Sequence, residues 1–226
     1  MFPGLAIVLI VLGITLVSNM AAGVLPQKLT EQVEALGVEI LYDEVTGLSR
    51  DGEGFAVQCT SGEQRCKAVV LATGAAHRHL GLDGEEELVG CGVSYCAVCD
   101  GAFYTGRDVA VVGGGDTALQ DALFLANSCR HVTLIHRRDQ FRGEDRLVRQ
   151  VENRENITIL YSHTVEALHA ANGELTGITV KDAKTGEEKE LAVEGLFAAV
   201  GQQPQSAPFA ALVNTAGGYY QAGEDT

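Results

Sequence analysis

The stretch DVAVVGGGDTALQDALFLAN, residues 108–127, joins an apolar run to a helical pattern through three glycines. The apolar residues 109–112 have the composition of a strand that is buried on both faces of a parallel sheet. After the glycines, apolar residues recur at the spacing of one helix face, at positions 118, 119, 122, 123, 125 and 126. The stretch therefore predicts a strand, a tight turn and a helix, and this unit decides the fold.

The glycine turn fits the pattern Gly-x-Gly-x-x-Ala in the context that a dinucleotide site requires. Gly113 would make the turn, Gly115 would let the backbone approach a pyrophosphate, and Ala118 would keep the helix close to the strand. The helix N-terminus would face the anion. The predicted contacts are Gly113, Gly114, Gly115, Asp116, Thr117 and Ala118. A tight glycine turn without a ligand is the alternative.

The end of the next predicted strand indicates which dinucleotide would bind. A site for NAD carries an acidic residue there, which accepts from the ribose 2′-hydroxyl. This chain has His136 in that place, followed by Arg137, Arg138 and Arg142. Because guanidinium groups match phosphate geometry, the pattern favours a 2′-phosphate and therefore NADPH. A solvated basic patch is the alternative.

Strands and helices alternate over the rest of the chain, which predicts an α/β fold with a parallel, doubly wound sheet. Residues 28–36 have helical spacing and end at Gly37. Asp51-Gly52 and Ser61-Gly62 mark turns in a hairpin region that contains Cys59 and Cys66, for which we expect no chemistry. Further predicted strands cover 68–74, which should be buried, and 131–139, 156–161 and 195–201.

Cys96 and Cys99, with Asp100 beside them, fit a dithiol–disulfide couple. Two residues between cysteines allow the bond to close, and the thiolate is the reactive form. Asp100 is placed to supply or accept a proton during exchange. A thioredoxin-type helix opening is disfavoured because two glycines follow Cys99 before the next strand.

The cysteines also match the spacing of plant-type iron–sulfur ligands, as Cys91, Cys96, Cys99 and Cys129. The helix predicted between Cys99 and Cys129 would span roughly 20 Å and is expected to carry Cys129 away from the other three. The dithiol interpretation is therefore favoured, and Cys91 and Cys129 are expected to be structural.

Composition narrows the function classes. The 226 residues are 46% hydrophobic and 20% charged, which is typical of a globular protein of one or two domains. A net charge of −14 disfavours nucleic acid as a partner. The N-terminal run over 5–17 is almost wholly apolar, and no charge precedes Lys28. A membrane anchor over 5–24, a signal peptide and a displaced domain start all remain open, with the last favoured.

Several motifs occur in a fixed order: Cys-x-x-Cys-Asp-Gly, Gly-Gly-Gly-Asp-Thr-Ala, His-Arg-Arg-Asp-x-Phe-Arg, GLFAAVGQQP and GGYYQAGEDT, preceded by LATGA. In this order and spacing the chain resembles bacterial thioredoxin reductases of the low-molecular-weight type over residues 27–226. The flavoprotein subunit of alkyl hydroperoxide reductase shares this core and is the alternative within the class.

The resemblance implies a Rossmann-like two-domain flavoprotein disulfide reductase fold with FAD and NADPH as cofactors. It implies that NADPH reduces FAD, that FAD reduces the disulfide, and that the dithiol reduces a protein disulfide, normally on thioredoxin. By the same resemblance Cys99 would lie against the flavin, Cys96 would attack the partner, and Asp100 would be the general acid. Thr73 and Gly74 would contact FAD. A cytoplasmic homodimer with rotating domains is also implied.

The resemblance divides the chain into four parts. These are an apolar segment at 1–27, part of an FAD-binding domain at 28–88, an NADPH-binding domain with the cysteine pair at 89–198, and a returning FAD-domain segment at 199–226. The family's first Gly-x-Gly-x-x-Gly does not precede Lys28, and its Gly-Asp motif is not reached by Thr226. We therefore expect a fragment, and a non-catalytic NADPH-binding module remains an alternative.

Overall fold

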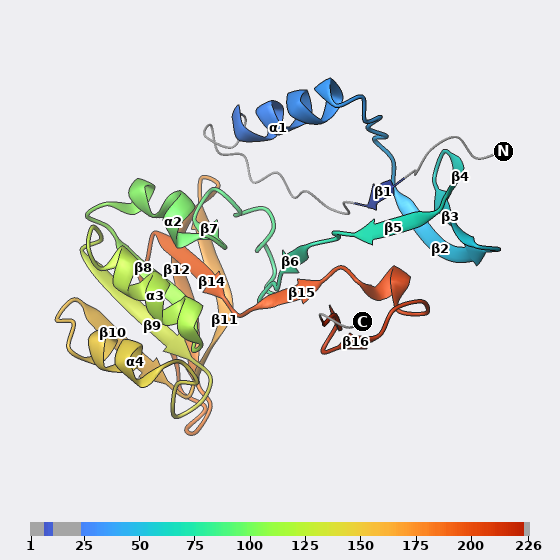
Figure 1. The fold of residues 1–226 in the computed structure, drawn as a ribbon. Helices are drawn as coiled ribbons and strands as arrows, with labels where there is room; N and C mark the ends of the chain where they lie inside the picture. Colours follow the sequence, from blue (N-terminus) through green and yellow to red (C-terminus); the bar gives the residue numbers. More distant parts are fainter. Residues whose placement is uncertain (1–6, 11–23, 224–226) are drawn as a thin grey trace. The chain divides into compact units, whose positions relative to one another are not determined.

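The computed structural model describes residues 7–10 and 24–223, and the chain divides into two compact units. The larger unit is His77–Gly201, and the smaller unit combines Met1–Ala76 with Gln202–Thr226 (Figure 1). The sequence interpretation placed the boundaries at 88/89 and 198/199, whereas the compact units divide at 76/77 and 201/202.

A five-stranded parallel sheet forms the centre of the larger unit, in the order β10-β9-β8-β14-β7. The strands are β7 (Val93–Ser94), β8 (Asp108–Gly113), β9 (His131–His136), β10 (Ile157–Tyr161) and β14 (Gly195–Ala199). Two helices, α3 (Asp116–Leu125) and α4 (Asp145–Glu152), connect β8 to β9 and β9 to β10. The predicted strand, turn and helix over 108–127 are thus confirmed.

The two faces of this sheet are covered differently (Figure 1). Val109, Val111 and Leu134 point to one face and pack with Leu119 and Leu147 of the helices. Because side chains alternate along a strand, Ala110, Ile135 and Leu196 point to the other face. There they pack against an antiparallel sheet of β11 (His163–Ala171), β12 (Glu174–Asp182) and β13 (Glu188–Leu191).

The prediction of a doubly wound sheet is wrong for this unit, although its parallel strands are confirmed. Within the described residues, the second face carries strands rather than helices. The reason is that residues 163–191 pair with one another as a long antiparallel meander before the chain returns to β14. The carboxyl end of β8 still leads directly into the glycine turn, because Gly113 is the last residue of the strand.

The smaller unit is built from short elements. They are β1 (Ile7–Ile10), α1 (Val24–Ala35), β2 (Val45–Asp51), β3 (Gly54–Cys59), β4 (Gly62–Cys66), β5 (Ala68–Leu71), β6 (Ala75–His77), β15 (Gln202–Pro204), the 3₁₀ helix η2 (Ala207–Phe209), β16 (Thr215–Ala216) and β17 (Tyr219–Tyr220). Strands β2, β3 and β4 form an antiparallel sheet with the turns that the sequence predicted. Gly37 follows α1 with a φ of +73°, which confirms the predicted helix end.

Strand β5 departs from the prediction that residues 68–74 form a buried strand. It pairs in parallel with β1, and the side chain of Val70 is 47% exposed. Val69 and Leu71 of the same strand are partly buried against the cluster of Val57, Cys66 and Phe209, so β5 is covered on one face. Cys59 and Cys66 lie in the β3–β4 hairpin, as expected, and burial raises the pKa of both thiols.

The apolar N-terminal run lies mostly outside the described residues. Only Ile7–Ile10 of the run over 5–17 is described, and these residues form β1 beside β5. The proposed anchor over 5–24 therefore lies largely outside the described part of the chain. In the part of the chain that is described, no helix combines enough length and apolar character to span a membrane.

Candidate functional site

The glycine turn at the end of β8 has two different steric requirements. Gly113 has a φ of +156°, and a Cβ atom there would lie 2.6 Å from the Cβ atom of Ala118 and would collide with the carbonyl oxygen of Ala199. Gly115 is the opposite case, because a Cβ atom there would meet nothing within 4 Å. Gly113 is therefore required by the packing of the unit, whereas Gly115 leaves open space in front of helix α3.

Helix α3 begins beside this open space, with Gly115 as its N-cap residue. The carboxylate of Asp116 accepts a hydrogen bond from the backbone N–H of Glu144 at 2.7 Å. The N–H of Arg142 donates to the carbonyl of Gly114 at 2.8 Å. These bonds hold the loop after β9 against the glycine turn, so the loop with the arginines is fixed beside the helix N-terminus.

His136 does not lie where the sequence analysis placed it. Its side chain is only 5% exposed, and its Nε2 atom is 3.0 Å from the carbonyl of Gln140. The ring occupies the space beside Gly114, where a Cβ atom would collide with it. Burial, with the nearby charges of Arg142 and Arg138, lowers the pKa of His136, so the ring is neutral at pH 7. His136 therefore supports the turn from behind and is not presented to a ligand phosphate.

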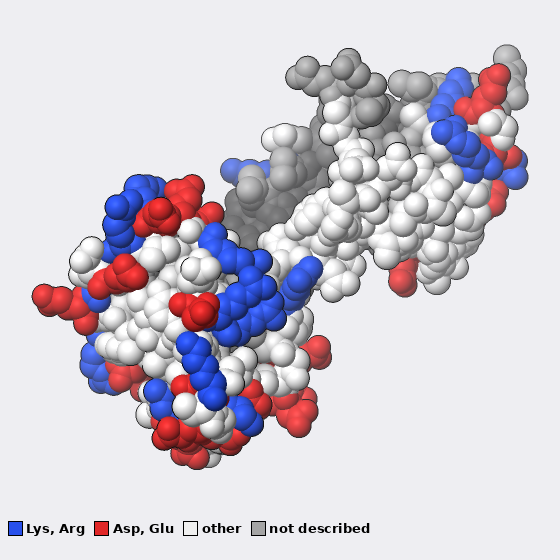
Figure 2. Space-filling model, turned by 90° about the horizontal axis from the view of Figure 1, so that it is seen from below, with Lys and Arg blue, Asp and Glu red and all other residues white. Residues whose placement is uncertain are grey.

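Arg137, Arg138 and Arg142 are exposed on the loop that follows β9. Within the described residues, none of the three forms an ion pair with an acidic side chain. Lysine and arginine side chains gather on one face of the larger unit in Figure 2. The three guanidinium groups are thus available to an anion beside the glycine turn. Thr117, the remaining predicted contact, is exposed on the first turn of α3.

Cys96 and Cys99 form a disulfide that spans the short helix α2 (Ala97–Asp100). The chain enters this helix from β7, and the sulfur of Cys96 accepts from the N–H of Cys99 at 3.2 Å. The pair follows a strand of the same sheet as the glycine turn. In the sheet, Phe197 of β14 pairs with Ser94 on one side and with Val111 on the other. The cysteine loop and the glycine turn therefore follow their strands at the same edge of the sheet.

Sequence reasoning missed the role of Ser94. Its hydroxyl donates to Asp100 at 2.6 Å and accepts from the N–H of Cys96 at 3.1 Å. Ser94 thus connects the candidate general acid to the first cysteine. The available signal was a serine two residues before the pair, since serine side chains commonly bond to nearby backbone N–H groups.

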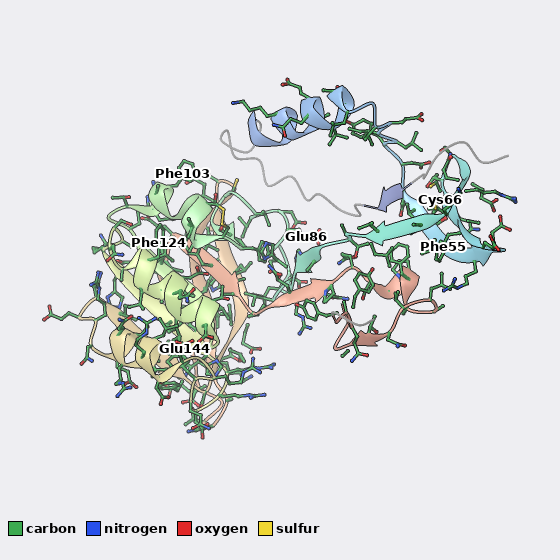
Figure 3. All side chains as sticks on the ribbon, viewed as in Figure 1. Phe55, Cys66, Glu86, Phe103, Phe124 and Glu144 are labelled. Atoms are coloured by element: carbon green, nitrogen blue, oxygen red, sulfur yellow. A yellow bond between two sulfur atoms is a disulfide. The ribbon has the colours of Figure 1, made fainter. Side chains whose placement is uncertain are left out.

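The surface around the disulfide is partly apolar. Cys96 is half-buried and Cys99 is exposed, and Val98 between them is 70% exposed. Phe103, in the 3₁₀ helix η1 (Gly101–Tyr104), is also 70% exposed, and Phe124 of α3 contacts the same region (Figure 3).

The loop after Cys99 meets the C-terminal end of α3, which packs on Gly101, and the carbonyl of Ser128 accepts from the N–H of Gly106. Within the described residues, no three potential metal ligands are gathered at one place. The loop after Cys99 runs back along the helix, which the sequence did not reveal. Two of the four thiols with iron–sulfur spacing are instead joined as a disulfide, and Cys129 is buried in the apolar core, where burial raises its pKa. Cys91 is exposed.

Thr73 and Gly74, the predicted FAD contacts, lie in the smaller unit. The hydroxyl of Thr73 is buried and lies 3.1 Å from the hydroxyl of Tyr220. Gly74 has a φ of +65°, and a Cβ atom there would meet nothing within 4 Å. Of the two, Gly74 leaves open space for a ligand, whereas the side chain of Thr73 is engaged within the protein.

Comparison with known proteins identifies the family. The family described as pyridine nucleotide-disulphide oxidoreductase matches residues 8–225. Thioredoxin reductase of Bacillus subtilis is 38% identical over 185 residues, which cover 82% of this chain and 58% of that protein. A bifunctional thioredoxin reductase/thioredoxin of Mycobacterium leprae is 41% identical over 177 residues, which cover 78% of this chain and 38% of that protein.

Solved structures agree with this match. The crystal structure of Lactococcus lactis thioredoxin reductase in its FR conformation has a TM-score of 0.73 and 34% identity, and the similarity covers 91% of this chain and 68% of that one. The fold is thus the two-domain, Rossmann-like fold of flavoprotein disulfide reductases. The chain spans less than two thirds of the length of the curated relatives described above. The chain belongs to the pyridine nucleotide-disulphide oxidoreductase family.

Proposed function

We propose that this chain carries the NADPH-binding and disulfide-exchange part of a thioredoxin-disulfide reductase. The observation that carries the proposal is the Cys96–Cys99 disulfide in the same compact unit as the glycine turn and its arginines. The open space at Gly115 suits a pyrophosphate at the helix N-terminus. The free guanidinium groups of Arg137, Arg138 and Arg142 suit a 2′-phosphate.

FAD is the second cofactor that the proposal requires. When bound, it would pass the electron pair from the nicotinamide to the disulfide. Gly74 offers the open backbone surface that such a ligand needs, and the hydroxyl of Thr73 would serve to fix the local turn through Tyr220. The purified chain should bind NADPH but retain little FAD, because the flavin candidates lie in the smaller unit, whose described residues form only a small buried cluster. Near-stoichiometric flavin absorbance after purification would contradict this prediction.

The exchange step uses groups of the larger unit. The Cys96 thiolate would attack one sulfur of the partner's disulfide, and that disulfide would break to give a mixed disulfide and a partner thiolate. Asp100, held by Ser94, would deliver the proton to that thiolate. The Cys99 thiolate would then attack the sulfur of Cys96, which restores the Cys96–Cys99 bond and expels the partner's second sulfur as a thiolate, and this thiolate takes up a proton from solvent.

Thioredoxin is the proposed partner. The Mycobacterium leprae relative carries both activities in its name, thioredoxin reductase and thioredoxin. In this chain, Val98 between the two cysteines, Phe103 and Phe124 are exposed, and they would provide an apolar surface for a protein. A homodimer of the full-length form and a cytoplasmic location are part of the same proposal.

Trapping of the mixed disulfide tests the assignment. Reduced Cys99→Ser chain should form a covalent adduct with oxidised thioredoxin, because Cys96 can attack but no second thiol resolves the product. The Cys96→Ser chain should form much less, and Cys129→Ser is a control at a buried thiol. Adducts would be counted by mass spectrometry under non-reducing conditions. Trapping through Cys99 alone would reverse the roles, and no adduct with either variant would favour the non-catalytic module.

A further inference from the structure

Tyr95, the residue directly before Cys96, has a side chain that is fixed by two other segments. Its hydroxyl donates to Glu85 Oε1 at 2.7 Å. The same oxygen lies 3.2 Å from His79 Nδ1. Because the hydroxyl has one hydrogen and that hydrogen is directed to Glu85, the contact with His79 requires the imidazole N–H as donor.

Glu85 is an unusually well-held acceptor. Its side chain is 2% exposed, whereas the adjacent Glu86 and Glu87 are exposed. The carboxylate accepts from the backbone N–H groups of a single turn, those of Leu80, Gly81 and Leu82. Burial alone would raise the pKa of Glu85, but these bonds and the Tyr95 hydroxyl outweigh it, and the pKa is lowered. Glu85 is therefore an anion at pH 7 and a rigid anchor.

Histidine rings complete the enclosure of Tyr95. The ring of His77 stacks on it with centroids 5.5 Å apart and an interplanar angle of 17°. The ring of His79 lies at 5.1 Å and is tilted. His77 is the first residue of the larger unit. The segment that enters this unit therefore holds the residue next to the first cysteine.

We propose that Tyr95 is a positioning residue for the Cys96–Cys99 couple, fixed by its hydrogen bond to Glu85. The inference rests on the proposed redox role of this pair and deepens it. The hydroxyl of Ser94 accepts from the N–H of Cys96, and the bond to Glu85 fixes Tyr95, which lies between these two residues. The backbone of Cys96 is therefore held in the geometry of the disulfide. In the dithiol, the same anchors keep the two sulfurs close and raise their effective concentration for ring closure.

The Tyr95→Phe variant tests this proposal because it keeps the ring and removes the hydroxyl. A hydrogen bond to a charged group is stronger than one between neutral groups, and the variant loses this bond while the disulfide is closed. We expect the equilibrium constant for closing Cys96–Cys99 to fall about tenfold, which corresponds to about 30 mV for a two-electron couple. The variant's disulfide should therefore be reduced more easily.

The equilibrium would be measured on the whole chain in dithiothreitol redox buffers, followed by alkylation and peptide mass spectrometry. Tyr161→Phe is the matched control, since Tyr161 lies in β10 of the same unit and its hydroxyl forms no hydrogen bond within the described residues. Glu85→Gln removes the charge of the acceptor, and its effect should not add to that of Tyr95→Phe, because both changes weaken the same bond. Urea unfolding of the oxidised forms would reveal any variant that fails to fold.

The outcomes separate the two levels of inference. If Cys96 and Cys99 do not titrate as one two-electron couple in the unmodified chain, the proposed function itself fails. If the unmodified pair titrates and Tyr95→Phe stays within about twofold of it, the positioning role is overturned. An equal shift in Tyr161→Phe would also overturn it. If Tyr95→Phe does not fold, Glu85→Gln takes its place in the test. An equilibrium constant for disulfide closure in Glu85→Gln within about twofold of that of the unmodified chain would then overturn the positioning role.

Discussion

The two compact units differ in how completely their side chains are packed. In the larger unit, β8, β9 and β14 contribute side chains to two buried clusters, one on each face of the sheet. Among the described residues of the smaller unit, the buried cluster consists of Val57, Cys66 and Phe209, with partly buried side chains packed against it. Each fully buried large apolar side chain contributes about 1.5 to 3 kcal/mol. Within the described residues, more of this burial therefore lies in the unit that carries the disulfide and the glycine turn.

The proposed roles are also divided between the two units. The candidate groups for NADPH binding and disulfide exchange lie in the larger unit, and the flavin candidates, Thr73 and Gly74, lie in the smaller unit. The smaller unit also exposes large apolar side chains, among them Leu36, Leu41, Tyr42 and Val70. The Cys96–Cys99 disulfide therefore lies in the unit with the larger buried clusters, and the flavin candidates lie in the unit whose described residues form the smaller one.

Hydrogen exchange should give the largest contrast between the two units. Amides of β8 and β14 exchange only through extensive unfolding of the sheet, whereas those of β3 should exchange through local opening. We expect protection in β8 to exceed that in β3 by about a thousandfold, or roughly 4 kcal/mol. Peptide-resolved exchange mass spectrometry would measure it. Equal protection in both strands would mean that the units unfold together.

Preference for NADPH over NADH should change only with substitutions at the arginines of the larger unit. Replacing Arg137 and Arg138 with Gln removes two guanidinium groups, each worth about 1.5 kcal/mol or more to a phosphate. Preference for NADPH over NADH should fall about a hundredfold in fluorescence titrations. Arg146→Gln, at an exposed position on α4, and Thr73→Ala, in the smaller unit, are the controls. An unchanged preference in the double variant would refute the arginine assignment.

Paired glycine substitutions should destabilise one unit at a time. Gly113→Ala introduces a Cβ atom that collides with Ala199, and Gly54→Ala introduces one that collides with the carbonyl of Cys66. Each should destabilise its own unit by about 2 to 3 kcal/mol, as measured by exchange in β8 and in β3. Gly115→Ala should leave stability nearly unchanged and weaken NADPH binding, since its Cβ atom would occupy the open space. Destabilisation of both units by either collision would contradict their independence.

The smallest effect concerns Asp121 on α3, whose pKa burial raises to about 6. The unfolded value is about 3.9, so the folded state binds the extra proton between these values. Asp121 therefore costs no stability below about pH 4, its cost grows between about pH 4 and 6, and the cost is constant above that. Asp121→Asn should stabilise the larger unit by about 1 to 2 kcal/mol at pH 8 and by little at pH 4. Exposed Asp139→Asn is the control, and equal gains at both pH values would exclude this cause.

The sequence predicted those features that depend on local pattern. The strand, turn and helix over 108–127 and the pairing of Cys96 with Cys99 follow from periodicity and spacing, and both are present. Features that depend on distant contacts were missed or misjudged. The acidic run at 85–87 gave no indication that Glu85 alone is buried, because its partners are backbone N–H groups and a tyrosine ten residues away.

His136 shows the same limit at the candidate NADPH site. Its position at the end of a strand indicated a ligand contact, but the direction of its side chain depends on the space left by Gly114. The return of the chain along α3 after Cys99 likewise depends on packing of Gly101 against Phe124 and Leu125. Such choices are decided by tertiary packing, which spacing in a single sequence does not encode.

The contact between Gly114 and His136 restricts the order in which mutations can accumulate. A Cβ atom at 114 would collide with the imidazole, so a substitution there forces the buried ring of His136 to move. A smaller residue at 136 must come first, and that intermediate carries a cavity in place of a buried ring. Evolutionary paths and combinatorial libraries that vary these positions one at a time will therefore lose stability at either position, whereas joint variation can reach new pairs.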